Sequence, residues 1–119
     1  MPYRDWRLHL EDILEAIGKI ERYSAGMDFE QFQADEKTAD AVVRNLEIIG
    51  EASRHIPREV QERNPNIPWD KMRGIRNVLV HEYFRVSLPI IWQTLKEDLP
   101  PLVPLLSEVL HQSRKHTGG

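Results

Sequence analysis

Apolar residues recur along this chain every three or four positions, the spacing that places them on one face of an α-helix. No segment alternates between apolar and polar residues as a half-buried strand would, and no stretch repeats another. The pattern therefore predicts an all-α fold. In the first helix, expected over residues 5–24, the inward-facing stripe consists of Trp6, Leu10, Ile13, Leu14, Ile17 and Ile20.

Helix-breaking residues divide the rest of the chain into segments. Gly26 is expected to end the first helix, and Pro65 and Pro68 bracket a loop. Ser87 is the expected N-cap of a later helix that tolerates Pro89 in its first turn. The remaining segments are a short piece around Phe29 and Phe32, helices over residues 35–55, 57–64 and 69–81, and a last helix after Pro100 and Pro101.

The 119 residues suit one domain, expected over residues 1–114, with a polar, flexible tail over residues 115–119. A chain this short buries only about two-thirds of the surface that its unfolded form exposes, so a second subunit often covers apolar surface that is left over. Cysteine is absent, which leaves no disulfide and no thiol nucleophile. Because no apolar run reaches the ~20 residues of a membrane span and no secretory leader is evident, we expect a cytoplasmic protein.

The formal net charge of −3 is unevenly distributed along the chain. Residues 1–52 hold 6 Lys and Arg against 12 Asp and Glu, whereas residues 53–85 hold 7 against 4. Basic charge thus gathers in the second region, where a local field could attract phosphate groups. A solvated face of mixed charge is the simpler alternative for such a composition.

Residues 76–83 combine a permanent cation, an amide, an imidazole and a phenol in the string Arg-Asn-Val-Leu-Val-His-Glu-Tyr. An arginine can neutralise the charge of a phosphorane, and a histidine can move the proton of a ribose hydroxyl or of a leaving oxygen, with no metal required. Arg76, Asn77 and His81 are therefore candidates for phosphodiester chemistry. Taken singly, Arg76 could be a paired surface cation, His81 a helix cap and Tyr83 a packing aromatic.

Helical spacing separates the two reactive groups of this string. Asn77 and His81 are four residues apart and share a face, as do Arg73 and Asn77, whereas Arg76 and His81 diverge by roughly 140° around an ideal helix. One chain therefore forms no obvious clamp. Two copies that cross near a two-fold axis would bring both arginines and both histidines into one cleft, so the spacing favours a composite site.

Two other residues are candidates for a supporting role. Glu51 could brace Arg76 across the bundle, and Arg73 lies on the same helix face as Asn77. Glu51 and His55, four residues apart, resemble half of a metal site, but no third ligand stands at a recognisable spacing. We therefore expect neither a metal nor a cofactor. The other histidines are expected at the surface: His9, His111 and His116.

Several strings flank the motif in a fixed order. They are Ile48-Ile49-Gly50-Glu51-Ala52, Ile67-Pro68-Trp69, Met72-Arg73-Gly74-Ile75-Arg76-Asn77, Ile91-Trp92 and Asp98-Leu99-Pro100. Together with Arg-x4-His-x-Tyr they make the chain resemble, over nearly its whole length, the HepT-type toxins of the HEPN domain superfamily, also catalogued as domain of unknown function eighty-six. Arg-x4-His alone would arise often by chance, but the flanking strings make the likeness specific.

The resemblance implies a homodimeric, antiparallel HEPN-type bundle of four to five main helices and a metal-independent endoribonuclease that is the toxin of a toxin–antitoxin pair. It also implies a partner, a minimal nucleotidyltransferase antitoxin, which silences the toxin by attaching AMP to a tyrosine. Carried over by motif position, Arg76 and His81 are catalytic, Asn77 is the adjacent polar residue, and Tyr83 accepts AMP. The sequence shows no departure from the family pattern at these four positions.

The expected reaction is transesterification within RNA, in which a ribose 2′-OH attacks the neighbouring phosphorus and leaves a cyclic phosphate. DNA lacks this hydroxyl and would be inert. The alternative is a non-catalytic HEPN module whose cleft binds a nucleotide or the partner enzyme.

Overall fold

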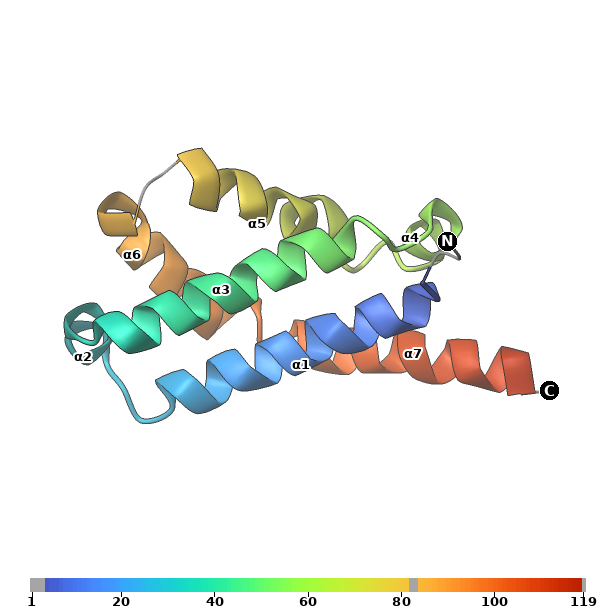
Figure 1. Ribbon diagram of the computed structural model, residues 1–119. Coiled ribbons are helices and arrows are strands. Elements are labelled where there is room, and N and C mark those ends of the chain that lie inside the picture. The colour runs from blue at the N-terminus through green and yellow to red at the C-terminus, as the bar shows by residue number, and fades with distance from the viewer. Residues whose placement is uncertain (1–3, 82–83, 119) are drawn as a thin grey trace.

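A computed structural model describes residues 4–81 and 84–118, with the backbone alone described for residues 76–81, 84–87 and 115–118. Within this part of the chain there are seven α-helices and one π-helical segment and no strand, in agreement with the predicted all-α fold. Three long helices, α1 (Trp6–Ser24), α3 (Glu36–Ser53) and α7 (Leu102–Gly118), run alongside one another, and α5 (Trp69–His81) packs on α3 (Figure 1). None of the described helices is long and apolar enough to cross a membrane.

Side-chain caps and one glycine define the ends of the two central helices. The Asp5 carboxylate accepts a backbone N–H at 3.0 Å at the start of α1, and Asp35 does the same at the start of α3. Gly26 follows α1 with φ at 76°, a left-handed conformation that glycine adopts at little cost. The helices predicted over residues 5–24 and 35–55 are therefore confirmed to within two residues at each end.

The apolar stripes of α1 and α3 meet in the centre of the bundle. The residues predicted to face inward on α1 are buried or partly buried against the core, which confirms that stripe. Burial of such side chains is the main source of stability for helices of this length, since isolated helices are marginal in water. The most deeply buried members of the two stripes are Leu10, Ile13, Ile17, Ile20, Val42, Leu46 and Ile49.

Helix α2 (Phe29–Ala34) closes one end of the bundle against α6 (Phe84–Gln93). The Phe32 ring is fully buried, and its centroid lies 5.1 Å from that of Trp92. The Lys96 ammonium lies 4.7 Å above the Trp92 ring, within reach of a cation–π attraction. This aromatic contact anchors the C-terminal end of α6 to α2.

The start of α6 differs from the prediction. The helix begins at Phe84, so the expected N-cap at Ser87 is wrong and Ser87 lies inside the helix. Pro89 consequently sits in the helix interior, where it removes a backbone hydrogen bond and costs about 3 kcal/mol. Burial of Ile91 and partial burial of Trp92 offset this cost, since each large apolar side chain contributes about 1.5–3 kcal/mol when fully buried.

A π-helical turn, η1 (Thr94–Asp98), follows α6 directly and was not predicted from the sequence. The Leu99 backbone N–H donates to the Thr94 carbonyl at 3.0 Å, an interval of five residues. Turns of this kind occur frequently at functional sites. Here the turn forms one wall of a groove between α5 and α7.

Helix α7 begins directly after Pro100 and Pro101, which confirms the predicted break. Its backbone stays helical to the end of the described residues, whereas a polar tail was expected after the apolar stripe. One contact beyond that stripe is an ion pair in which Arg114 Nη2 donates to Glu11 Oε2 of α1 at 2.7 Å. The flexible tail over residues 115–119 stays a prediction.

We expect Phe32→Ala to lower the free energy of unfolding by about 3–5 kcal/mol, because the substitution opens a cavity beneath Trp92. Tyr23→Ala is the matched control, since Tyr23 is 41% exposed and its removal should change stability by about 0.5 kcal/mol or less. Urea unfolding followed by far-UV circular dichroism measures both. Equal losses in the two variants would contradict the packing described for Phe32.

Candidate active site

The start of α5, the helix that carries the motif, is fixed by contacts to the preceding loop. The Trp69 indole N–H donates to the Asn64 carbonyl at 3.0 Å, and the ring is buried. One turn later Met72 is only 2% exposed and packs into the core. Pro65 and Pro68 keep the intervening chain out of a helix, as the sequence predicted.

Arg73, expected to support the motif, lies one turn into α5. Its guanidinium donates to Gln61 Oε1 of α4 (Arg58–Arg63) at 2.5 Å and to the Asp70 carboxylate. These contacts tie α5 to the short helix before it. They give Arg73 a structural role, and its part in chemistry stays a prediction.

Glu51, the other candidate for support, lies near the C-terminal end of α3 and is 53% exposed. Its carboxylate is 3.7 Å from His55 Nε2 and 3.8 Å from Arg54 Nη1. Among the residues that the structure describes, no group of three or more His, Cys, Asp and Glu side chains is placed to hold a metal. A contact between Glu51 and Arg76 stays a prediction.

The motif residues Arg76, Asn77 and His81 lie in the second half of α5, whose helical backbone reaches His81 as predicted. Their side chains fall outside the described part of the structure, and Tyr83 falls outside the described residues altogether. The convergence of the guanidinium and the imidazole therefore stays a prediction.

Backbone register still separates the two catalytic positions. Position 76 follows Met72 by four residues and so belongs to the face of α5 that is buried at Met72. Position 81 follows Gly74 by seven residues and belongs to another face. No described atom lies within 4 Å of the place that a Cβ would occupy at Gly74, so this second face is open there. A single protomer thus holds the two positions on different sides of one helix.

A second cluster of titratable side chains was missed by the sequence reasoning. The rings of His9 on α1 and His55, just after α3, stack with centroids 4.4 Å apart and planes 15° from parallel. Arg4, Trp6 and Arg63 line the same hollow of about 640 Å³. His9 is partly buried and lines this open hollow, so it keeps only part of the surface exposure that the sequence predicted. Antiparallel pairing of α1 and α3 brings these residues together, and only a prediction of that pairing could have found them.

The surroundings of His9 favour its neutral form. Burial lowers the pKa of His9, and the neighbouring His55 and Arg4 lower it further, while Asp12 acts in the opposite direction. A neutral His9 ring is suited to packing face to face on the ring of His55. The stacked pair joins the start of α1 to the end of α3.

The geometry and the motif together define a class of protein: an all-α bundle of HEPN type, in which Arg76, Asn77 and His81 of the motif lie on a helix that packs on α3. The family described as ribonuclease HepT-like matches residues 13–109. The chain belongs to this family, which confirms the resemblance noted from the sequence.

Relatives of known name share most of the chain. The "Probable ribonuclease HepT" of Thermococcus cleftensis is 48% identical over 99 residues, which cover 83% of this chain and 90% of the relative. The "Putative RNase MJ1380" of Methanocaldococcus jannaschii is 40% identical over 102 residues, covering 86% of this chain and 94% of the relative. No solved structure matches the chain.

We expect the protein to lose stability as the pH falls through the titration of His9. Folding lowers the pKa of His9, so the unfolded chain binds this proton more readily than the folded chain does. The neutral His9 therefore contributes fully to stability above the unfolded pKa of about 6.5, and this contribution is lost as the pH falls below that value. Thermal unfolding between about pH 8 and about pH 5 should show a smaller fall in melting temperature for His9→Gln than for wild type. His111→Gln, an exposed control on α7, should leave the wild-type decline unchanged. An identical pH dependence in wild type and His9→Gln would contradict this account.

Proposed function

We propose that this protein is a metal-independent endoribonuclease whose active site is completed by two protomers. Membership of the ribonuclease HepT-like family and the complete motif on α5 carry the proposal. The two relatives described above are named as ribonucleases, which supports RNA as the substrate. The register of α5 supports a composite site, because one helix holds positions 76 and 81 on different faces.

The reaction begins when a base removes the proton of a ribose 2′-OH. The 2′-oxygen then attacks the adjacent phosphorus, the bond to the 5′-oxygen breaks, and an acid protonates that leaving oxygen. The products are a 2′,3′-cyclic phosphate and a free 5′-hydroxyl. His81 of one protomer serves as base or acid, and the same residue of the second protomer takes the opposite role.

Arg76 stabilises the negative charge that gathers on the non-bridging oxygens as phosphorus becomes five-coordinate. Asn77, one helical turn before His81, orients the imidazole or donates to the phosphate. Because α5 ends at His81, the C-terminal end of the helix dipole favours the protonated imidazole and so the acid role.

We also propose that the enzyme is the toxin of a toxin–antitoxin pair and acts in the cytoplasm. Its antitoxin would be a minimal nucleotidyltransferase that transfers AMP from ATP to the Tyr83 hydroxyl and releases pyrophosphate. The added phosphate places negative charge two residues from His81, where it would repel the RNA backbone. No cofactor is needed for cleavage.

We expect His81→Ala and Arg76→Ala to abolish cleavage of a defined RNA pool in EDTA. Loss of a general acid–base should cost about 10²–10⁴-fold in rate, and loss of the arginine about 10²–10³-fold. His111→Ala and Arg58→Ala are matched controls on exposed positions away from α5 and should keep wild-type rates. Circular dichroism should confirm that all four variants fold.

Analysis of the product ends decides the mechanism. Cyclic phosphates must accumulate with wild type and not with His81→Ala. Equal cleavage by these two proteins would mean a contaminating nuclease and would refute the assignment. RNA binding without any cleavage by wild type would favour the non-catalytic HEPN module instead.

Incubation with ATP and the minimal nucleotidyltransferase that this proposal expects as the antitoxin should add the mass of one or more AMP groups and stop cleavage. Tyr83→Phe should receive no AMP at this position and should stay active in the presence of the nucleotidyltransferase. Intact-mass spectrometry with peptide mapping measures the modification. AMP found only on another residue would contradict the role given to Tyr83.

A further inference from the structure

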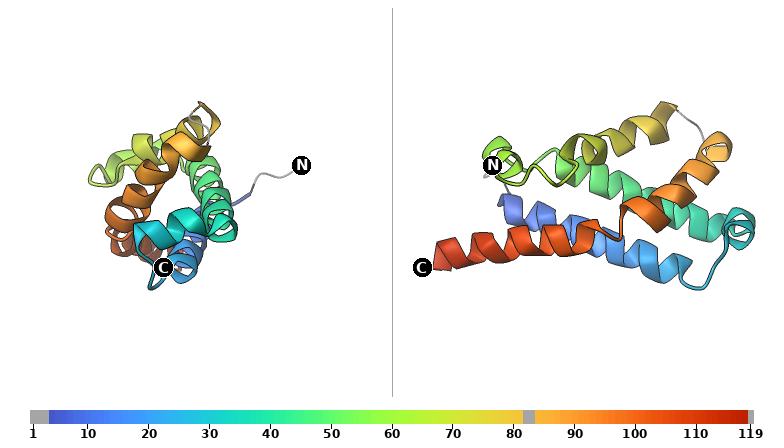
Figure 2. Two further views of the ribbon diagram at one scale, coloured as in Figure 1. Left: turned by 90° about the vertical axis from the view of Figure 1, so that its left-hand side faces the viewer. Right: turned by 180° about the vertical axis from the view of Figure 1, so that it is seen from behind.

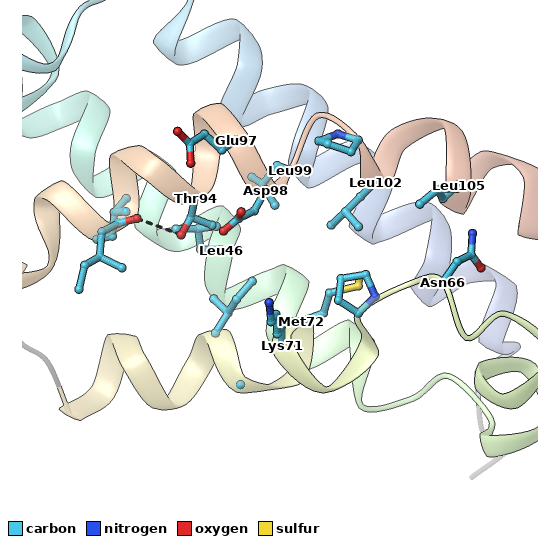
Figure 3. A pocket seen from close by; sticks show the side chains of 16 residues that line it. Leu46, Asn66, Lys71, Met72, Thr94, Glu97, Asp98, Leu99, Leu102 and Leu105 are labelled. Atoms are coloured by element: carbon cyan, nitrogen blue, oxygen red, sulfur yellow. Dashed lines mark hydrogen bonds between the residues drawn. The ribbon is translucent and has the colours of Figure 1, made fainter.

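An open groove runs between α5 and the segment formed by α6, η1 and α7 (Figure 3). Its volume is about 560 Å³, within the range of roughly 300–1,000 Å³ that is typical of small-molecule sites. Neither the motif nor the family match assigns a role to it. The groove begins beside the first turns of α5, and α5 continues from there to the motif.

The floor of the groove is apolar and is continuous with the hydrophobic core. It is formed by Met72 of α5, Ile91 of α6 and Leu99 at the end of η1, each of which is at most 3% exposed. Ile75 and Ile90 form the more exposed edges, with Ile90 50% exposed. Aliphatic walls of this kind can pack against the faces of a flat base, as apolar side chains do in sites that hold an extruded base and read its edge by hydrogen bonds.

Opposite charges face each other across this apolar floor. Lys71 stands on the α5 wall and Asp98 on the η1 wall, as Figure 3 shows. Neither side chain has an ion-pair or hydrogen-bond partner among the described residues. Glu97, in contrast, accepts a hydrogen bond from Gln93 at 3.1 Å. The groove therefore offers a ligand one cation and two carboxylates, of which that of Asp98 has no hydrogen-bond partner among the described residues.

We propose that this groove binds a nucleobase of the RNA next to the bond that is cut, with Asp98 as the residue that selects the base. The inference rests on the proposed ribonuclease function for its substrate. The base lies on the apolar floor, and its amino edge donates to the Asp98 carboxylate. Lys71 on the opposite wall contacts the phosphate of the same nucleotide.

The carboxylate gives the subsite a definite preference. Asp98 can only accept hydrogen bonds, so it favours bases that present an amino group. Guanine is the best fit, because its N1–H and 2-amino group form two adjacent donors for one carboxylate. Uracil is the poorest fit, since its single N–H lies between two carbonyl oxygens.

The position along α5 fits this role. Ile75 and His81 are six residues apart, which is about 9 Å along a helix axis. A base held at Ile75 and a phosphate held at the motif can thus belong to neighbouring parts of one RNA strand. Gly74, next to Ile75, leaves the groove wall open at that point, because no described atom outside its chain neighbours and the backbone of α5 lies within 4 Å of the place of its missing side chain.

NMR titration with 5′-mononucleotides tests the subsite without any cleavage. In protein with labelled isoleucine methyl groups, GMP should shift the signals of Ile75, Ile90 and Ile91. The signals of Ile13 and Ile20, buried between other helices, should stay in place and serve as internal references. IMP, which lacks the 2-amino group of GMP, should bind about tenfold more weakly, and UMP more weakly than CMP.

Two variants connect these preferences to the proposed residues. Asp98→Asn should make GMP and IMP bind nearly equally, whereas Asp40→Asn, an exposed control on α3, should keep the tenfold ratio. Lys71→Met should weaken all four nucleotides by a similar factor, and the control Lys37→Met should weaken none. A GMP preference that survives in Asp98→Asn would overturn the assignment of Asp98.

The failure of this proposal is distinguishable from failure of the proposed function. An enzyme that cuts RNA but shows no groove shifts with GMP would overturn the subsite alone. Groove shifts in a protein that cuts no RNA would refute the ribonuclease and leave the nucleotide site. If Ile90→Asp instead turns a dimer into a monomer, by light scattering, and GMP causes no shifts, a second protomer covers the groove and the proposal is wrong.

Discussion

The antiparallel packing of α1 on α3 is the contact on which the rest of this structure depends. Each helix buries an apolar stripe against the other, and neither would be stable alone in water. Helix α7 packs on α1, and α5 packs on α3, so each member of the central pair positions one further helix (Figure 2). The motif helix therefore takes its place from a core built largely by the first half of the chain.

The described anchors of α5 gather at its start, whereas the motif lies at its end. Trp69 and Arg73 connect the first turns to the preceding loop and to α4. Toward His81 the helix rises away from α3, as both side views show (Figures 1 and 2). The proposed composite site would lie at this end of α5, away from the described anchors.

Sequence reasoning succeeded where the determining signals are local. The bounds of α1, α3 and α5 follow from apolar periodicity combined with caps such as Asp5 and Asp35, which act within a few residues. It failed at the start of α6, where the rule that proline prefers a first turn was applied to Pro89. Contacts between distant elements, such as Trp92 on Phe32, stabilise a longer helix in spite of that local preference.

The same distinction separates the parts of the candidate site. Arg76, Asn77 and His81 could be found because they are neighbours in the chain, but the stacked His9 and His55 come from two helices that only the tertiary fold brings together. Lys71 and Asp98, on the two walls of the groove, are likewise brought together only by the tertiary fold, since no spacing rule links them. The proposed completion of the site by another protomer is one step further, because it depends on a contact between molecules. Helical spacing supports this proposal, since it places positions 76 and 81 on different faces of α5 and a single helix does not present both to one phosphate.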